Sequence, residues 1–263
     1  MTKIPLSQPD ITDHERRAVM EVLNTPKLSL GPKLKVFEDR IAAYAGVKYA
    51  VAVNSGTSGL HLMLRALGIT EGDEVITTPF SFIASANCIL FEKAVPVFTD
   101  IDPKTLNINV NLIEEKITPK TKAILAVDVF GHPCEWDKLE KIAKEHGLGL
   151  IEDSCEALGA EYRSRKAGSF GDAGIFAFYP NKQITTGEGG VIVTDNKDIY
   201  ELSRSMRNQG RGSGDKWLAH TMLGYNYRIS DINCALGIAQ MDRIDEILAK
   251  RSRVARMLSL IHI

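Results

Sequence analysis

Short, continuous apolar runs separated by amphipathic helical patterns restrict the fold of this chain more than any other feature. The runs are mostly continuous and rich in β-branched residues, which is typical of strands covered on both faces. Strands that alternate with helices usually pair in parallel. We therefore predict a mostly parallel α/β sheet. Its expected strands are residues 49–53, 74–77, 95–99, 123–127, 149–152, 173–178 and 190–194.

Helical patterns lie between and before these strands. Residues 57–67 and 136–146 carry apolar side chains at helical spacing. Before the first strand, Thr12 and Glu15 predict a capping box at the start of one helix, and residues 33–44 predict a second helix.

The part of the chain after the last strand contains a loop and a further helix. Residues 208–226 are rich in glycine and predict a mobile surface loop. Ser230 and Asp231 are suited to cap a single long helix, whose apolar stripe continues to about Arg256.

The composition excludes several classes of protein. A length of 263 residues suits one large domain, or one with a small appendage, and 44% hydrophobic with 25% charged residues is typical of a soluble globular chain. Lys and Arg total 32 against 33 for Asp and Glu, and this net charge of −1 indicates neither a nucleic-acid partner nor an acidic membrane. Residues 1–10 do not resemble a signal peptide and no apolar run is long enough to span a membrane, so we expect a cytoplasmic protein.

The cysteines are far apart in the sequence and form no CxxC pair. This spacing encodes neither a zinc site nor a disulfide framework, and we expect reduced, mostly buried thiols. They are Cys88, Cys134, Cys155 and Cys234.

Three segments carry the candidate chemistry, and the first is Asn-Ser-Gly-Thr-Ser-Gly at residues 54–59. It follows a predicted strand and opens a helix, so free backbone amides and the hydroxyls of Ser55 and Thr57 are suited to a phosphate. An ordinary strand-to-helix turn with a Ser or Thr cap explains the segment equally well.

The second segment places Asp153 directly after the strand at residues 149–152. In open α/β sheets ligands bind beyond the carboxyl ends of the strands, so this carboxylate is placed to hold a protonated heterocyclic nitrogen. The alternative is an aspartate that caps a helix.

The third segment places Lys182 between the aromatic strand at residues 173–178 and a glycine-rich turn. A lysine held there is partly desolvated, which favours the neutral, nucleophilic amine. A surface position is the alternative for any single lysine. One sheet thus carries, in this order, an anion-binding turn, an acid at a strand end and a lysine at a strand end. This order favours a Schiff-base lysine with pyridoxal 5′-phosphate (PLP).

Further motifs give the sequence a specific resemblance. They are NSGT at 54–57, PFSFIASAN at 79–87, ED at 152–153, GD at 171–172, YPNK at 179–182, GEGG at 187–190 and GYNYR at 224–228. With these motifs the chain resembles the fold-type-I PLP enzymes and, among them, the DegT/DnrJ/StrS family of nucleotide-sugar aminotransferases, from Ile4 almost to the C-terminus. The resemblance implies the three-layer large domain of that fold, with a mostly parallel, seven-stranded sheet.

The resemblance also implies a role for individual residues. Lys182 would carry the Schiff base and later move the proton, and Asp153 would pair with the pyridinium nitrogen. Gly56 and Thr57 would hold the phosphate, and Phe82 would stack on the ring face.

Asn226 matches an asparagine that, in this family, reaches the phosphate in the neighbouring subunit, so we expect a homodimer.

Two positions depart from the family pattern. Ala177 stands where many relatives have a serine phosphate ligand, so that contact is lost or supplied by Ser55 or water. Glu156 stands where relatives often have His or Gln, and it either lies beside the cofactor or turns away on a helix. Structural alternatives also remain for Phe82 as a core residue, and for Asn226 and Arg228 as ties of the glycine-rich segment.

The predicted function is a PLP-dependent aminotransferase. It would move an amino group from an amino acid, with glutamate the expected donor, to a keto group of a nucleotide-activated sugar, for surface polysaccharide or amino-sugar biosynthesis. Lysine rather than histidine at position 182 argues against the related sugar dehydratases. Another fold-type-I enzyme, such as a lyase or a non-sugar transaminase, and a non-catalytic PLP-binding regulatory relative stay open as alternatives.

The end of the chain carries its own expectation. Residues 1–257 should form the large cofactor-binding domain, and the small C-terminal domain with which family members continue is expected to be absent. Residues 258–263 read Leu-Ser-Leu-Ile-His-Ile. They match the translation of CTG TCT CTT ATA CAC ATC, the mosaic end used in transposase-based library preparation, and we interpret them as a non-native tail.

Overall fold

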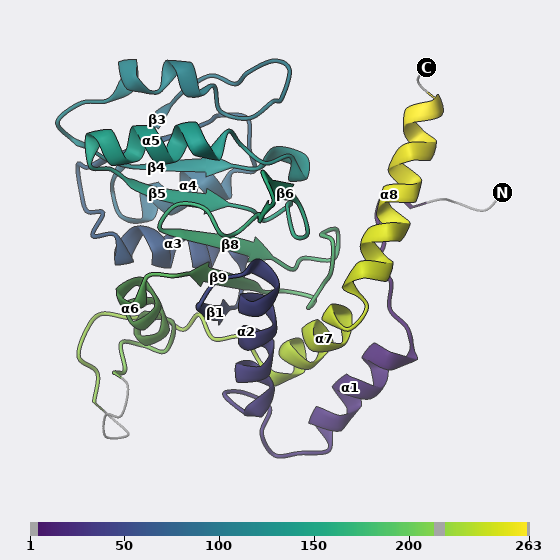
Figure 1. Cartoon of the computed structure of the whole chain (residues 1–263). Coiled ribbons are helices and arrows are strands. Elements are labelled where there is room, and N and C mark those ends of the chain that lie inside the picture. The colour runs from purple at the N-terminus through teal and green to yellow at the C-terminus, as the bar shows by residue number, and fades with distance from the viewer. Residues whose placement is uncertain (1–4, 213–218, 262–263) are drawn as a thin grey trace.

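A twisted sheet forms the centre of the computed structural model, which describes residues 5–212 and 219–261 (Figure 1). The strands are β1 (Tyr49–Val53), β2 (Glu74–Thr77), β3 (Val95–Phe98), β4 (Thr121–Val127), β5 (Gly149–Asp153), β8 (Ala173–Ala177) and β9 (Gly190–Thr194). Their spatial order is β1-β9-β8-β5-β4-β2-β3. β9 runs antiparallel to β1 and β8, and the other pairings in this sheet are parallel. The predicted mostly parallel, seven-stranded sheet is confirmed.

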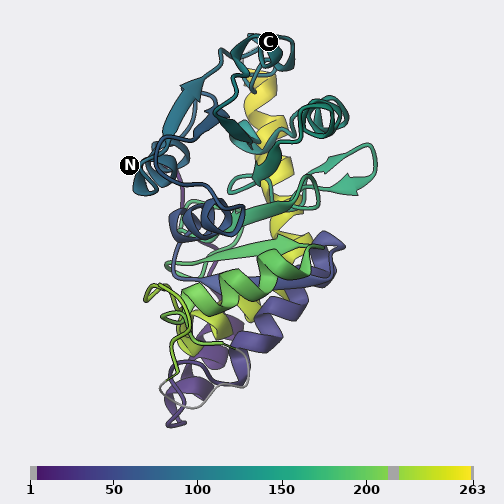
Figure 2. The same cartoon turned by 90° about the vertical axis from the view of Figure 1, so that its left-hand side faces the viewer.

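Helices cover both faces of the sheet and make three layers. They are α1 (Asp13–Leu23), α2 (Pro32–Ala45), α3 (Gly56–Ala66), α4 (Ala84–Phe91), α5 (Trp136–His146), α6 (Lys197–Arg207), α7 (Asp231–Met241) and α8 (Ile244–Ile261). The shorter elements are the hairpin of β6 (Glu161–Tyr162) and β7 (Arg165–Lys166) and the 3₁₀ turns η1 (Val110–Leu112), η2 (Glu114–Lys116) and η3 (Val129–Gly131). Figures 1 and 2 show α3 and α4 on one face and α2 and α5 on the other.

Strand β1 shows why the sequence runs are continuous rather than alternating. Val51 and Val53 pack into the core cluster under α3, α4 and α6, whereas Ala50 and Ala52 pack into the cluster under α2 and α7. Because both faces of the strand are buried, every position must be apolar. The predicted bounds of the strands and of the helices at 33–44, 57–67 and 136–146 agree with the structure to within two residues.

The predicted single C-terminal helix is wrong, because the chain turns between α7 and α8. The amide of Arg243 bonds to the carbonyl of Gln240, three residues back, rather than continuing the α-helical pattern. The side chain of Asp242 pairs with His14 and Arg40, and that of Arg243 with Asp10 and Glu15. These partners are distant in sequence, so the continuous apolar stripe gave no sign of the break.

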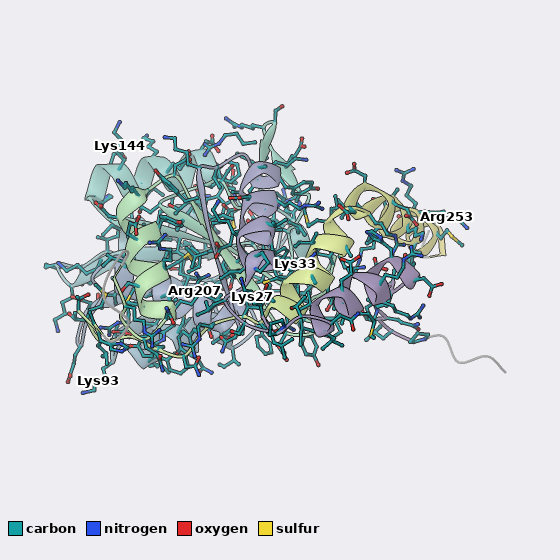
Figure 3. All side chains as sticks on the ribbon, turned by 90° about the horizontal axis from the view of Figure 1, so that it is seen from below. Lys27, Lys33, Lys93, Lys144, Arg207 and Arg253 are labelled. Atoms are coloured by element: carbon teal, nitrogen blue, oxygen red, sulfur yellow. The ribbon has the colours of Figure 1, made fainter. Side chains whose placement is uncertain are left out.

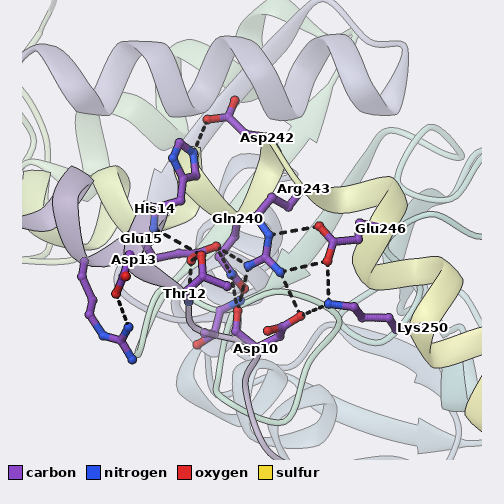
Figure 4. Close-up of polar contacts among 12 residues, drawn as sticks. Asp10, Thr12, Asp13, His14, Glu15, Gln240, Asp242, Arg243, Glu246 and Lys250 are labelled. Atoms are coloured by element: carbon purple, nitrogen blue, oxygen red, sulfur yellow. Dashed lines mark hydrogen bonds and ion pairs between the residues drawn. The ribbon is translucent and has the colours of Figure 1, made fainter.

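A polar cluster holds α1 against this turn (Figure 4). Arg243 donates to Glu15 Oε1 at 2.8 Å and to Asp10 Oδ2 at 2.9 Å. The predicted capping box is present, with Thr12 N donating to Glu15 Oε2 at 2.7 Å. Burial opposes the ionisation of Glu15, but hydrogen bonds from Thr12, Arg243 and Gln240 outweigh it and lower the pKa of Glu15 to about 2.

One arginine lies inside the molecule. Figure 3 shows Arg207 within the ribbon, whereas Lys93 and Lys144 extend from its edge. Arg207 Nη1 donates to Glu38 Oε1 at 2.5 Å and to the carbonyl of Ala52 at 2.6 Å, which ties α6 to α2 and β1. A buried charge needs such partners.

The described parts of the glycine-rich segment are tied together. Isolated bridges pair Asn208 with Asn226 and Arg211 with His220, and the Tyr225 amide bonds to the carbonyl of Met206 at 2.6 Å. The segment therefore folds back on itself next to α6, and the rest of the predicted loop, residues 213–218, lies outside the described residues.

Two further expectations concern the ends and the membrane. Helix α8 continues to Ile261, into the range interpreted as a non-native tail, and the origin of that range stays a prediction. Over residues 5–212 and 219–261, no helix combines the length and apolar character needed to cross a membrane.

The cysteines are unpaired thiols, and three of them, Cys88, Cys134 and Cys234, are buried.

Candidate active site

The loops at the carboxyl ends of the strands enclose a cavity of about 860 Å³. The strand register brings these loops together, because Asp153 at the end of β5 lies opposite Val127 of β4 and Ile175 of β8. This edge of an open α/β sheet is where ligands bind. Seven of the predicted site residues line the cavity: Ser55, Gly56, Thr57, Phe82, Asp153, Glu156 and Lys182.

Asn226 does not line this cavity. It is exposed and bridges Asn208 in the glycine-rich segment, where Arg228 also donates to Asn208 Oδ1 at 3.1 Å. Arg228 therefore ties this segment down, as its structural interpretation predicted.

The N-terminus of α3 combines a cap with an open first turn. Ser55 is the N-cap, and its Oγ accepts from the amide of Ser58 at 3.1 Å. The hydroxyl is thus used by the helix, and the capping interpretation of Ser55 is confirmed. The amides of Gly56 and Thr57 occupy the first turn, where no helical carbonyl precedes them. These amides, with the Thr57 hydroxyl, are the groups available to an anion.

Two glycines let the chain close around this turn. A Cβ on Gly56 would lie 2.9 Å from the Cβ of Ala177 and 3.0 Å from Cys155 Sγ. A Cβ on Gly190 would lie 2.7 Å from the carbonyl oxygen of Ser55. The 2.9 Å and 2.7 Å spacings are closer than a carbon atom tolerates. Strands β8 and β9 and the loop after β5 therefore pack directly against the start of α3.

Asp153 is buried at the end of β5, with 5% of its surface exposed. Its Oδ2 accepts from Ser85 Oγ at 2.9 Å and its Oδ1 accepts from the amide of Cys155 at 3.2 Å. Turns follow it, so the alternative that Asp153 caps a helix is wrong. Burial and the adjacent Asp153 carboxylate raise the pKa of the Cys155 thiol well above its usual range, so this wall residue is no thiolate nucleophile.

Lys182 follows β8 and reaches into the same cavity. Only 17% of its side chain is exposed, and Nζ donates to Glu156 Oε1 at 3.0 Å. The surface-lysine alternative is therefore wrong. From α8, Arg251 donates to the carbonyl oxygens of Asn181, at 3.2 Å, and of Lys182.

Glu156 lies on the turn after β5 and faces Lys182, so the alternative in which it turns away on a helix is wrong. Its second carboxylate oxygen accepts from the amide of Phe130 at 3.2 Å, and its carbonyl accepts from the side chain of Gln183. Glu156 thus connects the loop after β4 to the loop that carries the lysine.

Aromatic side chains form one wall of the cavity. Phe82 is 78% exposed and Phe130 is 74% exposed, so Phe82 does not belong to the core. Phe80 meets Phe130 edge to face with ring centroids 6.0 Å apart. Phe130 was not among the predicted site residues, although its place just beyond the strand at 123–127 could have indicated it, by the same rule that selected Asp153.

A buried acidic pair, which the sequence did not predict, lies at the base of the site. Ser154 Oγ lies 2.7 Å from Glu152 Oε1 and 3.1 Å from Asp128 Oδ2. Desolvation by burial raises the pKa of Asp128 to about 6 and raises that of Glu152 as well. Asp128 also lines the cavity. Within the described part of the chain, no three His, Cys, Asp or Glu side chains are grouped to hold a metal ion.

Comparisons with known proteins identify the family of this chain. Residues 9–260 match the model of the DegT/DnrJ/EryC1/StrS aminotransferase family. A GDP-perosamine synthase of Caulobacter vibrioides is 43% identical over 255 residues, covering 97% of this chain and 68% of the relative. A GDP-perosamine synthase of Escherichia coli O157:H7 is 41% identical over 256 residues, covering 97% and 70%.

Solved structures are similar as well. The Helicobacter pylori PseC, an aminotransferase involved in the biosynthesis of pseudoaminic acid, has a TM-score of 0.88 at 35% identity and covers 93% of this chain and 66% of its own. An aminotransferase from Psychrobacter cryohalolentis has a TM-score of 0.91 at 35% identity, covering 97% and 67%. The chain thus spans about two thirds of the length of these relatives. It belongs to the DegT/DnrJ/EryC1/StrS aminotransferase family.

Proposed function

We propose that this chain is the cofactor-binding part of a PLP-dependent aminotransferase. It would transfer an amino group from an amino acid, with glutamate as the donor, to a keto group of a nucleotide-activated sugar, for surface polysaccharide or amino-sugar biosynthesis. The single observation that carries this proposal is the meeting of Lys182, Asp153 and the first turn of α3 in one cavity. The names of the relatives, GDP-perosamine synthase and PseC, support a nucleotide-sugar substrate.

The donor set of the cavity fits PLP. The open amides of Gly56 and Thr57 suit its phosphate. The buried carboxylate of Asp153 suits a protonated ring nitrogen, and the exposed ring of Phe82 suits a flat heterocycle. When bound, PLP supplies an electron sink for the negative charge that develops when an amino acid loses its α proton.

Lys182 has two tasks in this proposal. Its amine would hold the cofactor in the cavity, and as a free amine it would accept the α proton of the amino-acid donor. Glu156 holds Nζ inside the cavity, and Asp153 keeps the ring nitrogen protonated. The reverse sequence of proton transfers would deliver nitrogen to the ketosugar.

A homodimer is part of the proposal, with Asn226 reaching the cofactor of the neighbouring subunit. The residues on either side of Asn226 face inward, because Tyr225 and Tyr227 both pack against His61 of α3. Asn226 lies between them, is exposed and does not line the cavity of its own chain. This arrangement leaves its side chain available to a second subunit. The cytoplasmic location stays a prediction.

The decisive experiment loads the purified protein with PLP, adds glutamate and follows the cofactor absorbance. Conversion to pyridoxamine phosphate is expected, whereas Lys182→Ala should not convert. Subsequent addition of keto-sugars or of keto acids distinguishes a sugar aminotransferase from a non-sugar transaminase. A bound cofactor that never converts would instead support a regulatory, non-catalytic protein, and conversion by Lys182→Ala at the native rate would overturn the site assignment.

A further inference from the structure

Two serine hydroxyls connect the cavity wall to the buried carboxylate of Asp153. Ser81 lines the cavity, and its Oγ lies 2.8 Å from Ser85 Oγ. Ser85 Oγ in turn lies 2.9 Å from Asp153 Oδ2. Ser85 is 1% exposed, so its hydroxyl is positioned by the protein rather than by solvent. None of the sequence motifs indicated this contact, because Ser85 and Asp153 are separated by 68 residues.

The direction of the two hydrogen bonds that join Ser81, Ser85 and Asp153 follows from the chemistry of the carboxylate. An ionised carboxylate only accepts hydrogen bonds, and a serine hydroxyl has one proton to donate. Ser85 therefore donates to Asp153, and Ser81 donates to Ser85. Both hydroxyl protons therefore point toward Asp153.

A buried carboxylate needs hydrogen-bond donors. Ser85 Oγ donates to Asp153 at 2.9 Å and the amide of Cys155 donates at 3.2 Å, and the Cys155 thiol is a further hydrogen-bonding neighbour. A hydrogen bond to a charged group is roughly twice as strong as one between neutral groups. The contact from Ser85 is shorter than that from the Cys155 amide, and it comes from a hydroxyl.

We propose that Ser85, with Ser81 behind it, is a positioning residue that orients the Asp153 carboxylate toward the cofactor ring nitrogen. The inference rests on the proposed function, since only a bound heteroaromatic ring gives Asp153 this task. The position of Ser85 is fixed because it lies in the first turn of α4, where its amide bonds to the carbonyl of Phe82 at 3.2 Å. The same turn thereby places the aromatic wall and the support of the acid.

The test measures the protonation of the ring nitrogen directly, in protein loaded with PLP that is ¹⁵N-labelled at that nitrogen. In Ser85→Ala the nitrogen resonance should move toward the position of the unprotonated ring, and the dissociation constant of PLP should rise about tenfold, the equivalent of one net hydrogen bond. Ser85→Cys preserves the volume with a weak donor and should shift the resonance in the same direction, which keeps the test available if the alanine variant does not fold. The matched control is Cys88→Ala, one turn along the same helix, whose thiol is also buried and donates to the carbonyl of Ser85 at 3.3 Å.

The control variant should leave the resonance at its native position. If both Ser85 variants bind PLP with a native resonance, the inference is wrong even where glutamate still converts the cofactor. If the native protein binds no PLP or shows no conversion, it is the proposed function that fails. The two failures are therefore distinguishable in one set of samples.

Discussion

Nζ of Lys182 lies 3.0 Å from Oε1 of Glu156, inside the cavity that the buried Asp153 also lines. The other oxygen of Glu156 accepts from the amide of Phe130, so the carboxylate is fixed from both sides. Glu156 can therefore store the lysine as an ammonium ion in the protein without cofactor, although the reaction with an aldehyde requires the neutral amine.

Glu156→Gln should accelerate the capture of PLP. Glutamine keeps the size of the side chain and removes the charge that holds the ammonium, so we expect capture at pH 7 to be about threefold faster, in line with a partly exposed ion pair. Stopped-flow absorbance after mixing with PLP measures the rate. Glu156→Asp keeps the charge and is the control, and a glutamine variant that captures PLP at the native rate or more slowly would contradict the storage role.

Ala177→Ser should tighten the binding of PLP. The Cβ of Ala177 faces the position where a Cβ of Gly56 would stand, so a serine hydroxyl there would meet the first turn of α3. One hydrogen bond to a charged phosphate corresponds to about a tenfold lower dissociation constant. Titration of the protein with PLP by fluorescence measures it. Ala177→Cys, of similar size but a weak donor, should stay close to the native value, and equal affinities for the serine and cysteine variants would refute the contact.

The sequence predicted the sheet because its strands are buried on both faces, and a short continuous apolar run such as residues 123–127 is typical of such a strand. It predicted the cavity residues because the ends of parallel strands meet at one edge. It could not predict contacts between distant residues, such as Ser85 with Asp153, or the break at Arg243, which depends on Asp10 and Glu15. These details follow from the tertiary packing and leave no periodic signal.

Arg251→Ala should weaken PLP binding without unfolding the protein. Arg251 donates from α8 to the carbonyl oxygens of Asn181 and Lys182, so its removal frees the loop that carries the lysine. We expect an approximately fivefold higher dissociation constant for PLP, and a change in unfolding free energy within about 1 kcal/mol, because the side chain lies at the surface. Arg253→Ala on the same helix is the matched control. Equal PLP affinities for the two variants would exclude a role of α8 in positioning the lysine.

The stability of the protein should fall in acid through Glu15. Its folded-state pKa of about 2 is below the usual value of 4.5, so its contribution is complete above pH 4.5 and is lost as the pH falls toward 2. The loss is at most about 3 kcal/mol, from the difference of the two pKa values. Asp128, whose folded-state pKa is raised to about 6, contributes in the opposite direction as the pH falls through about 6. Denaturant unfolding of the native protein and of Glu15→Gln from pH 2 to pH 7 separates the two, since the variant loses the Glu15 carboxylate and keeps Asp128.

Two inactive chains should restore one active site if Asn226 acts across the dimer. Asn226→Asp places a negative charge where the neighbour's phosphate is expected, and Lys182→Ala removes the amine, so each homodimer should fail to convert PLP with glutamate. A heterodimer of one Asn226→Asp chain and one Lys182→Ala chain can be purified through two different tags. One of its cavities then has the native Lys182 of the first chain and the native Asn226 of the second. About half of the bound cofactor should then convert. A heterodimer as inactive as its parents would mean that each chain uses its own Asn226, in conflict with the position of this residue outside the cavity.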